Sequence, residues 1–325
     1  MSLAQLLTDG HRFDAEYAAG LSNHLPMALV ALASLGADDA RLAAFALGYA
    51  RRLPPAPAAA EWPAGDAWKS RLGEREAWPA YRALFDQWLF HEDAAAVLGQ
   101  VLPPLMQGVG AVAFHGPIRT AAALRAGHRG ELADALAYWA CRWLDLGASH
   151  AVGRVADPAR LLPRLPAGDS AAGLIVERMR EGAAQRGFAP VVAQLVIADD
   201  TLGRLARTAA QLHAASGNFT ALHLVTSAHA MRLLLPFVEE PLPALRAYWR
   251  AYAAGVMASR IKPTRVADVA ATALPWPELL AAALASDDEH LIKLVDASRE
   301  EQQAYGGADD WQRAATRAVR DARQP

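Results

Sequence analysis

The spacing of hydrophobic positions along the chain predicts α-helices. Large apolar side chains recur every three or four residues in three segments: Trp78, Tyr81, Phe85 and Trp88; Leu132, Leu136, Trp139 and Trp143; and Leu245, Trp249, Tyr252 and Val256. Such a period places these side chains on one face of a helix. No stretch shows the sustained alternation of apolar and polar residues between hairpin turns that indicates β-strands. We therefore predict an all-α fold.

Four histidines mark the start of a loose recurring pattern. Each is followed 21 to 25 residues later by an aromatic residue, in the pairs His24 and Tyr49, His115 and Tyr138, His223 and Tyr248, and His290 and Trp311. That spacing suits two helices joined by a short loop, so it predicts an array of helical hairpins around a buried polar site. Helical hairpins of average length also produce such spacings by chance, and the pattern matches no established repeat.

Proline-rich stretches separate the predicted helices, because proline lacks the backbone N–H that a helix interior needs. The composition does not change across these stretches, so we interpret them as loops within one domain that spans residues 1–325. With 53% apolar residues in 325 positions, the chain can bury a large core.

The charge balance argues against several classes of partner. The 32 basic and 34 acidic residues give a formal net charge of −2, which offers no general attraction for nucleic acid or anionic lipid. The most apolar window, residues 221–238, contains two histidines and an arginine, which is unlike a membrane span. The first residues, MSLAQLLTDGHRFDAEY, lack the basic segment of a signal peptide. The single cysteine, Cys141, excludes internal disulfides and cysteine-rich zinc sites, and we expect a cytoplasmic protein.

Several familiar active-site motifs are absent from the sequence. It has no G-x-x-x-x-G-K-[ST], no G-x-S-x-G and no H-E-x-x-H. The segment GVGAVAF, which begins at Gly108, contains two glycines, but no predicted strand precedes it. We therefore exclude it as a dinucleotide-binding loop.

One apolar segment carries polar residues that need an explanation. ALHLVTSAHAMRLLLP, residues 221–236, contains His223, Thr226, His229 and Arg232. These side chains cost free energy to bury unless something in the interior binds them, so we predict a buried metal or substrate site. His223 and His229 are about 240° apart around an ideal helix, so both can reach one ion only from the flanks of the helix. One of them is then a supporting residue.

Two further histidines stand at predicted helix starts. His24 lies in SNHLPM, where Ser22 or Asn23 can cap a helix and Pro26 suits its first turn. The positive end of the helix dipole keeps such an imidazole neutral, which is the form that binds metals. His115 lies in AFHGPIR, where a glycine and a proline break one helix and begin the next.

The segment DDEHLIKLV, residues 287–295, places His290 and Lys293 three positions apart and hence on one helix face. An ammonium group has no lone pair for a metal, so Lys293 can contribute only when deprotonated or carbamylated. The alternative is a lysine stem that lies along apolar surface and pairs with Asp287, Asp288 or Asp296.

For each histidine alone, a core imidazole bonded to a carbonyl is an equally valid interpretation. Together, several neutral imidazoles with at most one carboxylate-like ligand suit iron(II), zinc or copper better than magnesium or calcium.

Four ordered segments resemble the questin oxidase family over residues 15–300. They are SNHLPMAL from Ser22 with LGA from Leu35, YRALF from Tyr81 leading to AFHGPIR, NFTALHLVTSAHAMR from Asn218, and DEHLIKL from Asp288. The resemblance implies an oxygenase of aromatic polyketide metabolism that opens an anthraquinone ring in a Baeyer–Villiger-like step, with O₂ and NADPH. It also implies a non-haem iron held by histidines, with a modified lysine as a further ligand.

The resemblance carries specific residues onto this chain. His24, His115, His223 and His229 match the family's histidine motifs, and Lys293 matches its lysine. The sequence departs from the family after His115, where HGPIRTAAA lacks an expected Gly-Tyr or similar pair. That departure bears on the aromatic substrate pocket and not on the metal.

The sequence thus predicts an iron(II)-dependent oxygenase that acts on an aromatic polyketide-like or quinone-like substrate with O₂, and NADPH is the predicted electron donor. We expect Arg119 or Arg232 to hold an anionic substrate oxygen and Thr226 to orient a ligand or water. Trp139 and Trp249 are candidates for a flat pocket wall or for the core. The alternatives are a metal-free helical scaffold that binds a partner, a zinc hydrolase with the same histidines, and a flavin-supported oxidoreductase.

Overall fold

The computed structural model describes residues 1–65, 67–148, 152–170, 173–262, 272–307 and 309–323. α-Helices dominate it, which confirms the predicted all-α class, and the described strands form one small hairpin of β1 (Glu16–Tyr17) and β2 (Leu21–Ser22). Within the described residues, no helix combines the length and the apolar character that a membrane crossing requires.

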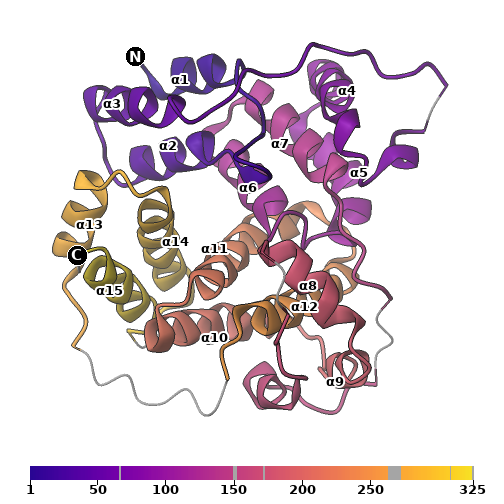
Figure 1. Cartoon of the computed structure of the whole chain (residues 1–325), viewed down its shortest axis with the longest axis vertical. Helices are drawn as coiled ribbons and strands as arrows, with labels where there is room; N and C mark the ends of the chain where they lie inside the picture. Colours follow the sequence, from indigo (N-terminus) through magenta and orange to yellow (C-terminus); the bar gives the residue numbers. More distant parts are fainter. Residues whose placement is uncertain (66, 149–151, 171–172, 263–271, 308, 324–325) are drawn as a thin grey trace.

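Four pairs of consecutive helices can be followed along the chain (Figure 1). Each pair packs together, and each begins near one of the histidines singled out above. The pairs are α2 (Leu25–Ser34) with α3 (Asp39–Ala50), α6 (His115–Ala126) with α7 (Arg129–Cys141), α11 (Phe219–Leu234) with α12 (Pro241–Ser259), and α14 (Glu289–Tyr305) with α15 (Asp310–Ala322).

The other helices pack beside these pairs. The α-helices are α1 (Leu3–Gly10), α4 (Trp78–His91), α5 (Ala94–Met106), α8 (Ile175–Ala184), α9 (Phe188–Val192), α10 (Thr201–Ser216) and α13 (Trp276–Ala285). Short 3₁₀ turns cover Trp68–Arg71, Arg75–Ala77, Pro158–Arg160, Leu162–Arg164 and Leu235–Phe237.

The predicted apolar faces are buried as their period requires. Leu245, Trp249, Tyr252 and Val256 all lie in the core along α12. In the other two segments the last aromatic residue is only half-buried. Trp88 lies near the end of α4, and Trp143 follows the end of α7. The period therefore predicted the buried face of each helix but not where the face ends.

The core consists of two apolar clusters. The larger one contains most of the buried side chains of α4–α7 and α10–α12, and the smaller one those of α1–α3 and α13–α15. Helix α2 packs against α6, and α14 packs against α11, so these contacts join the two clusters. The starts of these four helices carry the four histidines, which therefore lie where the two clusters meet.

The turn before α6 has a strained backbone. Val112, Ala113 and Phe114 have φ angles of 48°, 53° and 71°, a run of left-handed residues without a glycine. This conformation costs roughly 1–2 kcal/mol for each residue, and it is rare for a β-branched residue such as valine. Strain of this kind persists only where the surrounding structure imposes it, and it concentrates at functional sites.

A glycine at position 113 tests this strain. Ala113→Gly removes the clash of Cβ with the backbone, so we expect the free energy of unfolding to rise by about 0.5–1 kcal/mol after the entropy cost of glycine is subtracted. The matched control, Ala96→Gly, changes an exposed alanine within α5 and should lower the free energy of unfolding by about 1 kcal/mol. Urea unfolding measures both changes. A loss of stability in Ala113→Gly would contradict the assignment of strain.

Candidate metal and substrate site

Three imidazoles from three separate helices converge in the interior. His24 immediately precedes α2, His115 is the first residue of α6, and His223 lies in the second turn of α11. All three are buried, and one ring nitrogen from each lies within 4.8 Å of the others. The ring centroids are 4.6 Å apart for His24 and His115 and 5.0 Å apart for His115 and His223.

Backbone carbonyls fix the protonation of all three rings. The Nδ1 atom of His24 lies 2.6 Å from the Ser22 carbonyl oxygen, and that of His115 lies 2.6 Å from the Val112 oxygen. The Nδ1 atom of His223 lies 2.8 Å from the carbonyl oxygen of Phe219, one turn earlier on α11. A carbonyl oxygen can only accept, so each Nδ1 carries the hydrogen and donates it. In a neutral ring, Nε2 is then left with a bare lone pair.

Two of these lone pairs face each other directly. The Nε2 atoms of His24 and His115 are 2.9 Å apart, the distance of a hydrogen bond, although neither has a hydrogen to donate once both Nδ1 atoms are protonated. Facing lone pairs repel unless a cation lies between them. The arrangement therefore fits a metal ion, because histidine ligands donate the second ring N–H to carbonyls in this way.

Burial keeps the three rings uncharged. It lowers the pKa of His24, His115 and His223 well below the ordinary value, and neighbouring positive charge lowers them further. For His24 and His115 the largest such effect comes from Lys293, whereas for His223 it is the repulsion that a proton on the His115 ring would exert. A neutral imidazole is the form that binds a metal.

A fourth histidine and a carboxylate complete the group. The ring of His290, near the start of α14, lies 4.6 Å from that of His24 and 5.5 Å from that of His223 between centroids. The preceding residue, Glu289, is also buried, and its carboxylate forms a second possible metal-binding set with His24 and His290. Glu289 pairs with Arg52 at 3.5 Å.

Lys293 lies beside this group, in the interior. Its side chain is only 5% exposed, and burial lowers the pKa of its amine to about 7, against the opposing effect of Glu289. The aspartates considered as surface partners are engaged elsewhere: Asp287 pairs with Arg41, Asp288 caps α14, and Asp296 pairs with Arg125. A lysine stem on the surface is therefore the wrong interpretation of Lys293.

A cavity of about 370 Å³ adjoins the imidazoles. His24, His115, His223 and His290 all line it, and so does Glu289. The rest of the lining is largely apolar and comes from the β1–β2 hairpin, the strained turn, the start of α8 and Phe219, whose ring lies against those of His223 and His290. The starts of α2, α6, α8, α11 and α14 all contribute lining residues, and the positive ends of their dipoles favour a negatively charged ligand.

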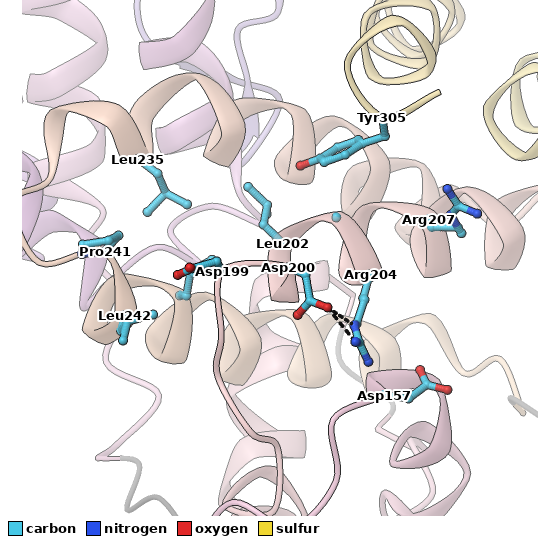
Figure 2. Close-up of a pocket in the computed structure, with 12 residues that line it drawn as sticks. Asp157, Asp199, Asp200, Leu202, Arg204, Arg207, Leu235, Pro241, Leu242 and Tyr305 are labelled. Carbon is cyan, nitrogen blue, oxygen red and sulfur yellow. Dashed lines mark hydrogen bonds and ion pairs between the residues drawn. The ribbon is translucent and has the colours of Figure 1, made fainter. Parts of the chain in front are cut away.

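A larger groove elsewhere lacks this chemistry. It has a volume of about 680 Å³ and is drawn in Figure 2. Its polar residues are carboxylates, arginines and Tyr305, and Asp200 and Arg204 pair with each other across one helical turn at 2.6 Å. No histidine is among the described residues that line it. Size alone therefore does not identify the site, whereas the converging imidazoles do.

The structure does not bring two of the predicted site residues on α11 into this group. The Nδ1 atom of His229 lies 2.9 Å from Glu301, and Arg232 donates to the same carboxylate oxygen at 2.7 Å. Neither residue lines the cavity. The reason is the six-residue separation from His223, which turns His229 toward a different part of α14. This correction removes His229 from the set of converging imidazoles and Arg232 from the substrate wall.

Arg119 and Thr226 also lie outside the cavity wall. Arg119 is buried against Glu131 and Asp134, at 2.6 and 3.3 Å, so its charge is already neutralised. The hydroxyl of Thr226 donates to backbone carbonyls of its own helix, at 3.3 Å from Leu222 and from His223. The predicted roles in holding substrate or water therefore do not fit these positions.

Trp139 and Trp249 belong to the core and not to the cavity. The ring of Trp139 packs on Gly116, where an added Cβ would lie 2.7 Å from it, so the glycine lets α6 and α7 approach closely. Trp249 donates from its indole nitrogen to the Val192 carbonyl at 2.9 Å.

Two residues that line the cavity have no clear signal in the sequence. Arg178, on α8, lines the cavity, and its guanidinium donates to the carbonyls of Ala258 at 3.1 Å and Gly173 at 2.8 Å. Glu289 stands beside His290, but acidic residues are common at helix starts, so its sequence position alone does not distinguish it.

One family model matches most of the chain. The model of the family described as Questin oxidase-like matches residues 21–298, which include all four converging histidines and Lys293. The chain belongs to the Questin oxidase-like family. The family description indicates an oxidoreductase. No curated protein matches the chain.

The buried imidazoles of this family member predict a loss of stability in acid. The unfolded chain takes up protons on these rings below about pH 6.5, whereas the folded metal-free protein does not, because its pKa values are lowered. The contribution of these rings to the free energy of unfolding should therefore be retained above about pH 6.5 and fall below it, by about 1.4 kcal/mol per pH unit for each ring.

Urea unfolding of metal-free protein at pH 7.5 and 5.5 measures this dependence. His223→Gln should reduce the slope, whereas His91→Gln, which changes an exposed residue at the end of α4, should not. Equal stability at both pH values would show that these rings are not buried as neutral groups.

Proposed function

We propose that the protein is a non-haem iron(II)-dependent oxygenase that acts on an anionic aromatic substrate of the polyketide or quinone type. The main support is the approach of the Nε2 atoms of His24 and His115 to 2.9 Å. Both rings donate their Nδ1 hydrogens to backbone carbonyls, so the two Nε2 lone pairs face each other. Family membership supplies the redox character, and the adjacent cavity supplies a place for the substrate.

The imidazoles of His24, His115, His223 and His290 would hold the metal. The Nε2 atoms of His24 and His115 lie 2.9 Å apart, close enough for both to reach one ion. Several imidazoles and few carboxylates suit iron(II), and such a metal supplies O₂ activation and stabilises oxygen-centred negative charge.

The proposed reaction inserts one oxygen atom between a ring carbonyl carbon and the neighbouring ring carbon. The second atom of O₂ leaves as water, which requires two electrons and two protons. NADPH with one proton provides them. The protein residues bind the substrate, hold it against the imidazole group and exclude bulk water from the cavity.

The cavity suits a flat anion. Its volume of about 370 Å³ is near the small end of the range for ligand sites, and its wall of hairpin, turn and Phe219 is mostly apolar. Arg178 lies in this wall, with its guanidinium oriented by two carbonyls. We assign to Arg178 the role of holding an anionic oxygen, which the sequence had suggested for Arg119 or Arg232.

Lys293 is a further proposed contributor. With a pKa of about 7, a large fraction of its amine is uncharged at neutral pH and can add to CO₂, releasing one proton and forming a carbamate. A carbamate has carboxylate-like oxygens that can bind a metal, whereas an ammonium group cannot. The charge of a free ammonium among four imidazoles disfavours metal binding, so the modification also removes a repulsion.

The alternatives fit the geometry less well. A metal-free scaffold gains nothing from two lone pairs held face to face. A zinc hydrolase can use the same imidazoles, but the family description indicates redox chemistry.

Metal analysis tests the proposed centre. Protein purified without oxygen or chelators should contain close to one iron per chain, and His115→Gln and His223→Gln should each reduce that content at least tenfold. His213→Gln is the matched control, because His213 is buried on α10 and outside the cavity. His229→Gln should also retain iron.

Circular dichroism shows whether each variant folds. Zinc at full occupancy in place of iron would contradict the proposal, and so would an unchanged iron content in both ligand variants. A loss of iron in His229→Gln alone would restore the ligand set inferred from the sequence.

Oxygen uptake tests the reaction and the role of Arg178. The iron-loaded protein should consume O₂ with a hydroxyanthraquinone carboxylate and NADPH. Arg178→Gln should raise KM about tenfold or more with little change in kcat, because a charged hydrogen bond to the substrate is lost. Arg180→Gln, an exposed position on the same helix, should leave KM unchanged. An equal KM in Arg178→Gln and Arg180→Gln would remove Arg178 from the substrate site.

A further inference from the structure

A separate cavity contains two arginines and no described carboxylate. It has a volume of about 390 Å³ and lies between α12, residues 107–110 and residues 146–148. Arg246 and Arg250 line it, four positions apart on α12 and so on the same face of that helix. The remaining wall is mostly apolar and includes Val109, Leu242 and Pro243.

Arg250 is a buried cation with incomplete compensation. The residue is only 7% exposed, its Nε donates to the Leu146 carbonyl oxygen, and its guanidinium stacks 5.2 Å from the centre of the Phe188 ring. Its Nη1 atom is buried without a hydrogen-bond partner in the described part of the chain. Burial lowers its pKa, and the carboxylate of Asp145 opposes this effect without forming an ion pair.

The loop at residues 145–147 lies close to the guanidinium of Arg250. Gly147 has a φ angle of 84°, and a Cβ placed there would lie 2.9 Å from Nη2 of Arg250. The backbone N–H of Gly147 binds the Asp145 carboxylate at 2.6 Å, so that acid is engaged in its own loop. Any larger residue at position 147 would displace the arginine from the cavity wall.

Arg246 adds a second charge. It is half-buried, and among the described residues it forms neither a hydrogen bond nor an ion pair. A buried or half-buried cation without a counter-ion is costly, because the charge loses hydration and gains no partner. Two such cations on one cavity wall indicate that the missing partner is an anion from solution.

We propose that this cavity binds a small molecule through a phosphate group, with Arg246 and Arg250 as the paired cations. A phosphate monoester has three terminal oxygens that can accept from two guanidinium groups at once, whereas a carboxylate has two oxygens and suits a single arginine. The cavity is larger than a phosphate group, so its apolar wall accommodates the compact organic part of the ester.

The cavity is distinct from the imidazole site but shares one structural element with it. Val109 and Gly110 line this cavity, whereas Val112 and Ala113 of the same turn line the other. None of the described residues that line the phosphate cavity is a histidine of the imidazole site, so this proposal does not depend on iron or on oxygenase activity.

Isothermal titration of the full-length protein with phenyl phosphate tests the assignment. We expect saturable binding of one phenyl phosphate per chain, weakened at least tenfold by Arg246→Gln and by Arg250→Met. Arg180→Gln, which removes an exposed charge on α8, should bind phenyl phosphate as the unchanged protein does. Benzoate, which carries a carboxylate on the same ring, should bind at least tenfold more weakly than phenyl phosphate.

Either of two results would overturn the proposal. One is phenyl phosphate binding that is absent, or that is equally strong in Arg246→Gln and Arg180→Gln. The other is benzoate binding as tight as that of phenyl phosphate, which would make the cavity a carboxylate site. If Arg250→Met does not fold, the half-buried Arg246→Gln decides the result by itself.

Discussion

The site depends on one arrangement: neutral imidazoles held by their Nδ1 hydrogens on backbone carbonyls, so that their Nε2 lone pairs point into a shared space. Each carbonyl comes from the local backbone of its own histidine, at Ser22, Val112 and Phe219. The orientation of each ring is therefore fixed by its own helix start, and packing between helices has only to bring the starts together. Burial then keeps the rings uncharged, which preserves the lone pairs.

The position of the site between two apolar clusters explains how a polar group survives in the interior. Helices α2 and α14 belong largely to the smaller cluster, and α6 and α11 largely to the larger one. Their starts meet where the clusters join, beside a cavity and not within a dense core. The strained turn at Val112 and Ala113 supports the same site. The Val112 carbonyl accepts the Nδ1 hydrogen of His115, and both residues form part of the cavity wall.

The arginines of this protein differ in whether they lie against carboxylates or line a cavity. Arg119 is neutralised by two carboxylates and Arg232 by Glu301. Arg178 lines the imidazole cavity, and Arg246 and Arg250 line another that contains no described carboxylate. The net charge of −2 does not reveal which arginines are neutralised and which line a cavity. The proposed anion sites are therefore inferred from local geometry and not from composition.

The sequence by itself determined the helical class, the buried faces and the four histidines at hairpin starts, because these follow from a period of 3.6 residues and from local glycine, proline and capping residues. It also singled out Lys293 as unusual. It did not separate His223 from His229, or Arg178 from Arg119, because position on a helix does not reveal which neighbouring helix a side chain meets. Nor did it show that the segment at Gly108, excluded as a dinucleotide loop, leads into the strained turn. Only the packing of distant helices decided these points, since contacts between them fix which polar groups share a cavity and which neutralise each other.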